Sequence, residues 1–339
     1  GLRPARYVIT RDRHITLASE IGVYNYAPED VVAKGRLKPG QMIAVDTSTG
    51  TLLLPADIDT HLKSGKPYRK WLKEHVKHLD SVLNGEELSR QPLDHATLQA
   101  YQKMFQVTFE ERDQVLSVLA EVGQEAVGSM GDDTPMAVLS EQVRSLYDYF
   151  RQQFAQVTNP PIDPLREQIV MSLETCLGRE KNMFEETADH AARLIIDSPV
   201  LSEGKFQHLL NMGDANYAAT VIDLNYAPGM GLRRAIETLC DHAVAAVRSG
   251  TVVVVLSDRA IAHDRLPAHA LLATGAVHHR LIRAGLRCDA NIVVETATAR
   301  DPHQIAALIG YGATAVYPYL AYECLHNMRA SGDIVGKTA

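Results

Sequence analysis

Thr251-Val-Val-Val-Val-Leu256 is the run of sequence that decides the fold. Such an unbroken series of apolar and β-branched residues predicts a strand that is buried on both faces, as strands of parallel sheets are. A helix is predicted before it, over residues 232–248, and Ser249-Gly250 ends that helix. Another helix is predicted after it, over residues 267–284, and Gly285 closes it. A buried strand between two helices indicates βαβ units.

The alternation of strand and helix continues in both directions from this run. Further strands are predicted at residues 194–197, 217–223, 291–295 and 313–317, and a further helix at residues 302–309. Strands separated by one helix, with glycine after each helix, indicate right-handed crossovers. We therefore predict an α/β fold, which is either an open doubly wound sheet or part of a barrel.

The chain before residue 124 has a different character. Residues 1–56 carry strand signals in two hairpin candidates, at 6–19 and 40–54, and two hairpins alone make a poor core. Residues 57–123 form a polar, mostly helical connector, with helices predicted at 58–64, 67–83 and 110–122, and we expect it to be a solvated surface layer. An apolar stripe also predicts a helix over residues 137–154.

The composition excludes several classes of function. The 339 residues are 46% hydrophobic and 22% charged, which is ordinary for a soluble globular protein. A net charge of −7 argues against a nucleic-acid partner, and no apolar run is long enough to predict a transmembrane helix. The chain begins at Gly1 with neither an initiator methionine nor a signal peptide, so we expect it to be a fragment of a longer protein.

The cysteines are spaced too widely to predict a metal site. They are Cys176, Cys240, Cys288 and Cys324. Two of them, Cys240 and Cys288, lie in apolar sequence, and we expect buried, inert thiols in a reducing cytoplasm.

Polar residues stand where several predicted strands end, and active sites of α/β folds lie at the carboxyl ends of strands. These residues are Asp197, Asp223, Asp258 and Glu295. One interpretation is an autonomous enzyme that uses Asp258, His263 and Glu295 for metal-assisted or acid–base chemistry. The alternative is that the carboxylates cap the following helices, as Asp301 before Pro302 is expected to do.

A glycine-rich segment, Gly229-Met-Gly231, stands beside Arg233-Arg234 and suggests a phosphate cradle. It lacks the third glycine of a dinucleotide-binding fingerprint. We therefore expect it only to begin the following helix.

Two loops in the middle of the chain end in helix-start signals. They are Gly128-Ser-Met-Gly-Asp-Asp-Thr-Pro135 and Gln156-Val-Thr-Asn-Pro-Pro-Ile-Asp163, the second followed by Pro164. These loops, with Leu146-Tyr-Asp-Tyr-Phe150, Arg287-Cys-Asp-Ala-Asn-Ile-Val-Val-Glu-Thr296 and Val316-Tyr-Pro-Tyr-Leu-Ala-Tyr-Glu323, resemble the central region of the large subunit of glutamate synthase. The resemblance runs nearly end to end.

The resemblance implies a domain organisation. Residues 1–56 would be the last strands of a class II glutamine amidotransferase (glutaminase) domain, 57–123 a helical connector, and 124–339 the central α/β domain, for which it favours a partial, barrel-like arrangement of βαβ units. The family's nucleophile is a cysteine at the mature N-terminus, whereas residue 1 here is Gly1. We therefore expect no catalytic residue in this chain.

The resemblance also implies a role. The whole enzyme forms glutamate from glutamine and 2-oxoglutarate, and this piece would link the glutaminase and flavin domains and line the ammonia tunnel between them. Met130, Thr158 and Ile162 match positions at the mouth of that tunnel. FMN and an iron–sulfur cluster would be bound outside this region, so no cofactor or metal is expected here.

The partners implied are the remaining glutaminase and flavin domains of the same chain, with a reductase subunit or ferredoxin as electron donor. No nucleic acid or membrane partner is expected, and the location is expected to be cytoplasmic. An unpaired sheet edge in residues 1–55 predicts a homo-oligomer. An alternative function is a docking module for other subunits or protomers.

Overall fold

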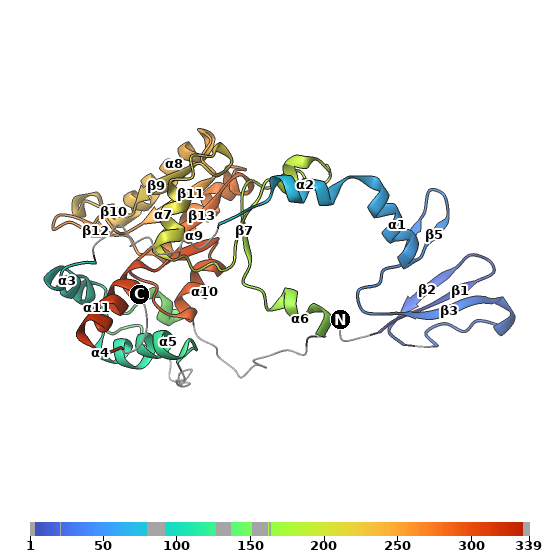
Figure 1. The fold of residues 1–339 in the computed structure, drawn as a ribbon, viewed down its shortest axis with the longest axis horizontal. Helices are drawn as coiled ribbons and strands as arrows, with labels where there is room; N and C mark the ends of the chain where they lie inside the picture. Colours follow the sequence, from blue (N-terminus) through green and yellow to red (C-terminus); the bar gives the residue numbers. More distant parts are fainter. Residues whose placement is uncertain are drawn as a thin grey trace. The chain divides into compact units, whose positions relative to one another are not determined.

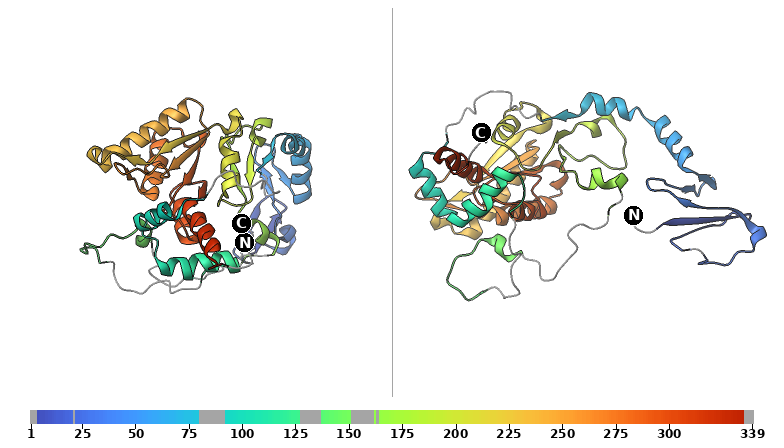
Figure 2. Two further views of the ribbon diagram at one scale, coloured as in Figure 1. Left: turned by 60° about the vertical axis from the view of Figure 1, so that its left-hand side comes forward. Right: turned by 60° about the horizontal axis from the view of Figure 1, so that its bottom comes forward.

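The computed structural model describes residues 4–20, 22–79, 92–126, 137–150, 162 and 164–334, with the backbone alone for Leu165. The chain forms two compact units. The first comprises Gly1–Trp71 and Ala155–Ser172, and the second comprises Leu72–Phe154 and Leu173–Ala339. Figure 1 and Figure 2 show the fold of each. None of the helices in the described ranges is long and apolar enough to cross a membrane.

The first unit is built on a three-stranded antiparallel sheet in the order β2-β1-β3. Its strands are β1 (Ala5–Thr10), β2 (Ile15–Ala18) and β3 (Val31–Leu37). The hairpin of β1 and β2 confirms the sequence prediction, whereas β3 was not predicted. The Tyr7 side chain of β1 covers Gly35 of β3, because a Cβ atom there would lie 2.6 Å from the Tyr7 hydroxyl.

A second hairpin, β4 (Ala44–Asp46) and β5 (Thr51–Leu53), is also confirmed. The Asp46 carboxylate accepts the backbone N–H groups of Ser48 and Thr49 and so closes its turn. The helices of this unit are α1 (Pro55–Gly65) and α6 (Pro164–Val170), and η1 (Pro28–Asp30) precedes β3. Thr10 is the single buried residue among those whose side chains are described in this unit, which agrees with the poor core expected of two hairpins.

The second unit contains the predicted parallel sheet. Its strands are β9 (Ala219–Asp223), β11 (Val253–Ser257), β13 (Asn291–Glu295) and β14 (Ala315–Tyr317), in the order β14-β13-β11-β9. All three strand pairings are parallel. Val200 forms an isolated parallel bridge to Val316 beyond β14. The α/β class is therefore confirmed, while closure into a partial barrel stays a prediction.

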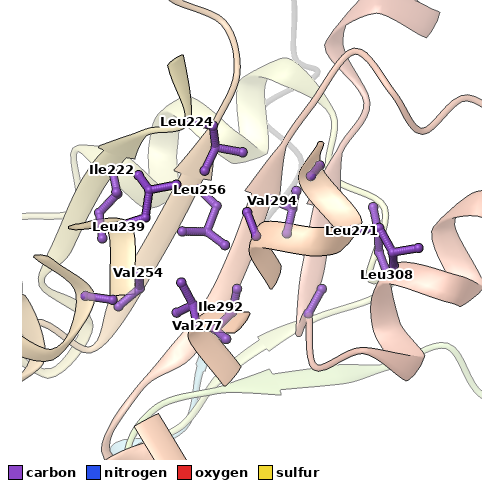
Figure 3. Close-up of a cluster of buried hydrophobic side chains, with 14 of the residues drawn as sticks. Ile222, Leu224, Leu239, Val254, Leu256, Leu271, Val277, Ile292, Val294 and Leu308 are labelled. Atoms are coloured by element: carbon purple, nitrogen blue, oxygen red, sulfur yellow. The ribbon is translucent and has the colours of Figure 1, made fainter. Parts of the chain in front are cut away.

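Helices lie on both faces of this sheet. One face packs against α8 (Leu232–Arg248), α9 (Ala270–Arg283) and α10 (Pro302–Gly310). The opposite face packs against α7 (Glu203–Leu210), α11 (Tyr319–Ser331) and α3 (His95–Met104). Because strand side chains alternate, Val254 and Leu256 of β11 enter the first core while Val253 and Val255 enter the second. Figure 3 shows the first of these cores.

The predicted strand at residues 194–197 exists but belongs to another sheet. Strand β8 (Leu194–Ile196) pairs with β6 (Lys77–His78) and β7 (Thr175–Leu177) and not with β9. A short apolar run specifies a buried strand without specifying its neighbour, so the prediction of its sheet was wrong.

The helix predicted over residues 137–154 is also wrong within its described part. Only the 3₁₀ turn η3 (Leu146–Tyr149) forms there, and Val138 and Val143 of the expected apolar stripe are exposed. Tyr147 is 1% exposed and packs into the core on the α9 side of the sheet. The segment is therefore held to the core by the Tyr147 side chain, and not by the continuous apolar helix face that the spacing of its apolar residues predicted.

The connector is more deeply integrated than a solvated layer. Helix α2 (Tyr68–His75) precedes β6, and α4 (Phe109–Glu111), the π-helical η2 (Arg112–Leu116) and α5 (Ser117–Val122) run on as one helical stretch. Helix α3 lies where no helix was predicted. Leu98 and Leu116 are 2% and 1% exposed and belong to the core on the α11 side of the sheet.

The remaining elements are short. They are η4 (Ala188–Ala191), η5 (Ala215–Tyr217), β10 (Asn225–Tyr226), η6 (Pro228–Met230), β12 (Leu266–Pro267) and η7 (Arg287–Asp289). The prediction that all cysteines are buried was half right. Cys240 and Cys324 are buried, but Cys176 and Cys288 are exposed.

Candidate functional site

The carboxyl ends of β11, β13 and β14 carry a dense group of polar side chains, which we call the carboxyl-end cluster. Its members are Ser257, Asp258, Arg259, Glu295, Thr296, Thr298, Arg300, Tyr317, Tyr319 and Glu323. Parallel strands place their carboxyl ends on one edge, which is why residues from three strands meet there.

Asp258 lies at the centre of this cluster and is 0% exposed. Its carboxyl accepts hydrogen bonds from Thr296 Oγ1 at 2.5 Å and from the backbone N–H of Ala297 at 3.0 Å. Burial raises the pKa of Asp258 to about 6, because desolvation disfavours the charged form more than these donors favour it.

The Tyr319 side chain lies beside Asp258. Burial and the neighbouring carboxyl raise the pKa of Tyr319 far above its usual range, so the phenol stays protonated. Its hydroxyl is buried and forms no hydrogen bond with the residues described.

Arg259 is a partly buried cation held by two buried carboxylates. Its guanidinium Nη1 lies 3.1 Å from Glu295 Oε1, and its Nη2 lies 3.4 Å from Glu323 Oε1. The three side chains are 14%, 8% and 9% exposed. The guanidinium also lies 4.5 Å from the centre of the Tyr319 ring, a cation–π distance.

Both carboxylates have further donors. Ser257 Oγ donates to Glu295 Oε2 at 2.6 Å, and the backbone N–H of Leu93 donates to Glu323 Oε2 at 2.9 Å. Four elements or loops are thereby tied to one arginine, whose charge the two carboxylates neutralise. Its Nε is buried and has no hydrogen-bond partner among the described residues.

A second arginine ties the connector to the same edge. Arg300 Nε and Nη2 donate to the two carboxylate oxygens of Glu111 at 2.5 and 3.1 Å, and its Nη1 donates to the Ala297 carbonyl at 2.8 Å. A bidentate arginine–carboxylate pair of this kind fixes orientation as well as distance.

The η3 turn closes the cluster from another side. Tyr147 Oη lies 3.2 Å from Thr298 Oγ1, and His303 Nε2 donates to the Tyr147 carbonyl at 3.2 Å. The His269 ring lies 5.1 Å from the Tyr147 ring, and its Nδ1 accepts the Leu271 N–H at the start of α9. Burial, with the positive charge of Arg300, lowers the pKa of His269 to about 4, so the ring is neutral.

The structure separates the residues of the autonomous-enzyme hypothesis. Asp258 and Glu295 do meet, since the Asp258 N–H donates to the Glu295 carbonyl at 3.2 Å. His263 is exposed and makes no hydrogen bond with either of them. No group of three potential metal ligands occurs in the described ranges.

The other strand-end carboxylates have structural partners. Asp197 pairs with Lys205, Asp223 pairs with Arg265, and Asp301 accepts the Gln304 N–H as the N-cap of α10, as predicted. Gly231, with a φ of 74°, is the N-cap of α8, so the glycine-rich segment does begin that helix.

Two of the three residues expected to line a tunnel, Met130 and Thr158, lie outside the described residues. Ile162 is described and is half-buried. Sequence reasoning missed Arg259, Arg300 and Glu111. The signal available for Arg259 was its place directly after Asp258 at the end of the strongest strand.

The comparisons with known families cover most of the chain. Residues 100–339 match the glutamate synthase central domain, and residues 1–71 match the class-II glutamine amidotransferases.

Individual relatives match over nearly the full chain. The chloroplastic ferredoxin-dependent glutamate synthase of Oryza sativa subsp. japonica is 43% identical over 339 residues, which are 99% of this chain and 21% of the relative. The glutamate synthase [NADPH] large chain of Azospirillum brasilense is 42% identical over 338 residues, which are 98% of this chain and 22% of the relative. The glutamate synthase [NADH] of Schizosaccharomyces pombe is 39% identical over 337 residues, which are 96% of this chain and 16% of the relative. The chain thus spans about a fifth of the length of these relatives.

Proposed function

Because this chain belongs to the glutamate synthase family, we propose that it is the part of such an enzyme that links the glutaminase domain to the flavin domain. In this proposal the whole protein forms glutamate from glutamine and 2-oxoglutarate, and this part carries no catalytic residue. The observation that carries the proposal is that one chain matches both the class-II amidotransferases and the central domain.

The carboxyl-end cluster supports the scaffold role. In an α/β enzyme this edge would present polar side chains to a substrate. Here Arg259 is neutralised by Glu295 and Glu323, and Arg300 by Glu111. Groups that are already paired and buried hold loops in place, and they are not free to bind a substrate.

The cysteines also support it. Burial raises the pKa of the Cys240 and Cys324 thiols, so these two side chains resist forming the thiolate that a nucleophile requires. An iron–sulfur cluster needs several cysteines at one site, and the residues described here form no such group. We propose that the family's FMN and iron–sulfur cluster are bound in the remaining four fifths of the protein, as the resemblance implies.

The proposal includes a conduit for ammonia. Ammonia must travel between two sites without being protonated by bulk water, which requires a walled and mostly apolar path. Met130, Thr158 and Ile162 are the proposed lining: methionine adapts its shape, threonine offers one hydroxyl, and isoleucine excludes water.

We also retain a partial barrel for the central domain, because each helix-linked strand from β9 to β14 lies beside its predecessor, as barrel strands do.

Coupling of the two half-reactions tests the conduit. In the full-length enzyme, Ile162→Ala should raise the amount of glutamine hydrolysed per 2-oxoglutarate consumed, because ammonia escapes. Ile169→Ala is a matched control, since Ile169 is 77% exposed on α6. An unchanged ratio in Ile162→Ala, or an equal rise in both variants, would count against the lining role.

The remaining parts of the proposal concern partners and location. The electron donor would be a reductase subunit or ferredoxin. The rice relative is named ferredoxin-dependent, and the Azospirillum brasilense relative is named an NADPH glutamate synthase large chain. We propose a cytoplasmic location, although the rice relative is named as chloroplastic.

A further inference from the structure

A turn in the second unit, residues 182–185, holds two large apolar side chains out into solvent, and we call it the Met-Phe turn. Met183 and Phe184 are 83% and 90% exposed, and Phe184 is the most exposed aromatic residue in the described ranges. Apolar residues that stand singly on a surface are ordinary, whereas adjacent ones form a patch of the kind that marks an interaction site.

Hydrogen bonds fix the backbone of the Met-Phe turn. The Asn182 carbonyl accepts the Glu185 N–H at 3.0 Å, and Asn182 Oδ1 accepts the Phe184 N–H at 3.1 Å. Asn182 Nδ2 donates to Glu185 Oε1 at 2.9 Å, and His190 Nε2 donates to the Asn182 carbonyl at 3.0 Å. Because this backbone is already ordered, a partner that binds the two apolar side chains pays little for ordering it.

The surface around the turn is acidic. Glu185, Glu186 and Asp189 are exposed, and Lys181 is the single lysine or arginine in residues 180–190. An apolar centre with an acidic rim fits a partner that has an apolar pocket with a cationic rim. The same rim disfavours a two-fold contact between copies of this chain, because the two acidic rims would then face each other.

The rest of the full-length protein is large enough to supply such a partner, since this chain spans 21% of the rice relative. The amidotransferase match, residues 1–71, coincides with the first segment of the first unit, whereas the Met-Phe turn belongs to the second unit. The partner is therefore sought in the flavin domain and not in the remainder of the glutaminase domain.

We propose that the Met-Phe turn docks into an apolar pocket with a cationic rim on the flavin domain of the same protein. The inference rests on the proposed function, which joins this part of the protein to a flavin domain. Phe184 fills the pocket as a buried aromatic anchor, Met183 packs beside it, and the acidic rim faces the cations of the partner.

Hydroxyl-radical labelling of the full-length enzyme, followed by mass spectrometry, measures the solvent access of Met183 and Phe184. Side chains that are 83% and 90% exposed would be labelled nearly as fast in the native enzyme as in urea. Docking predicts labelling of both that is at least about tenfold slower in the native enzyme than in the unfolded one, because anchors of this kind are fully desolvated.

Phe184→Arg in the full-length enzyme tests the anchor itself. The variant should raise the rate of proteolytic cleavage between this part and the flavin domain by at least about tenfold, because the undocked population rises. It should leave the fold of this chain intact, since Phe184 is 90% exposed within it. Leu139→Arg is the matched control, because Leu139 is 96% exposed in the same unit, and its cleavage rate should stay at the wild-type value.

Equal labelling of Met183 in the native and unfolded enzyme, or equal cleavage of the Phe184→Arg and Leu139→Arg variants, would overturn the proposal. Protection of Met183 that appears only as the protein concentration rises would assign the turn to a contact between copies, and would also overturn it. Failure of the proposed function would show itself separately, as saturable ammonia release from glutamine by this chain alone.

Discussion

Replacing Arg259 with leucine should destabilise the second unit more than any exposed substitution does. The change leaves Glu295 and Glu323, which are 8% and 9% exposed, without their shared cation at 3.1 and 3.4 Å. Removing one partner of a buried ion pair costs about 3–5 kcal/mol, because a buried charge is left uncompensated. Since 1.4 kcal/mol is a factor of ten, amide protection in β11 and β13 should fall by at least about a hundredfold.

Native-state hydrogen exchange of the amides of Val254 and Val294 measures this effect directly. Arg280→Leu is the matched control, because its pair with Asp241 is exposed and is worth about 0–1 kcal/mol. A triple variant, Arg259→Leu with Glu295→Gln and Glu323→Gln, removes the uncompensated charges and should recover part of the protection. The reasoning would be refuted if Arg259→Leu behaved like Arg280→Leu, or if the triple variant were no better protected than the single one.

Three further predictions concern titration and capping in the same unit. Asp258 has a folded pKa of about 6 against an ordinary 3.8, so its contribution to stability is present below pH 3.8 and is lost as the pH rises towards 6. Denaturation at several pH values should show the wild type losing about 3 kcal/mol relative to Asp258→Asn between pH 4 and 7, and parallel curves would contradict this. His269 has a folded pKa of about 4 against 6.5, so the stabilisation present above pH 6.5 is lost as the pH falls towards 4. His269→Asn should remove that loss, also about 3 kcal/mol, in the same titration. Asp301→Ala should cost about 1 kcal/mol in urea denaturation because the Gln304 N–H loses its cap, whereas Asp301→Asn should cost less.

The parallel sheet was largely predictable from the sequence because its signals are local. An unbroken apolar strand such as β11 and helices ended by glycine need no knowledge of distant residues. Helix α8 was predicted with the bounds that the structure has, Leu232–Arg248. The pairing of β8 with β6 joins segments more than a hundred residues apart, and no local pattern carries that information.

In the carboxyl-end cluster, too, some residues could be predicted from local sequence and others depend on contacts between distant segments. The sequence indicated Asp258 and Glu295, because both end a strand. It did not indicate that Arg259 pairs with Glu295 and Glu323. Nor did it indicate the Arg300–Glu111 pair, which joins residues 189 positions apart. An arginine in sequence is most often a surface residue, and only the fold shows that Arg259 is 14% exposed between two carboxylates.

Ammonia release from glutamine by this chain alone tests the central claim most directly. The chain would be purified, checked for its fold by circular dichroism, and assayed with glutamine at a sensitivity below about one turnover per minute, well under the usual range of enzymes. The scaffold account predicts no saturable release, with release restored only in the full-length enzyme. Saturable release by the isolated chain would mean that it contains a nucleophile, and would contradict the account.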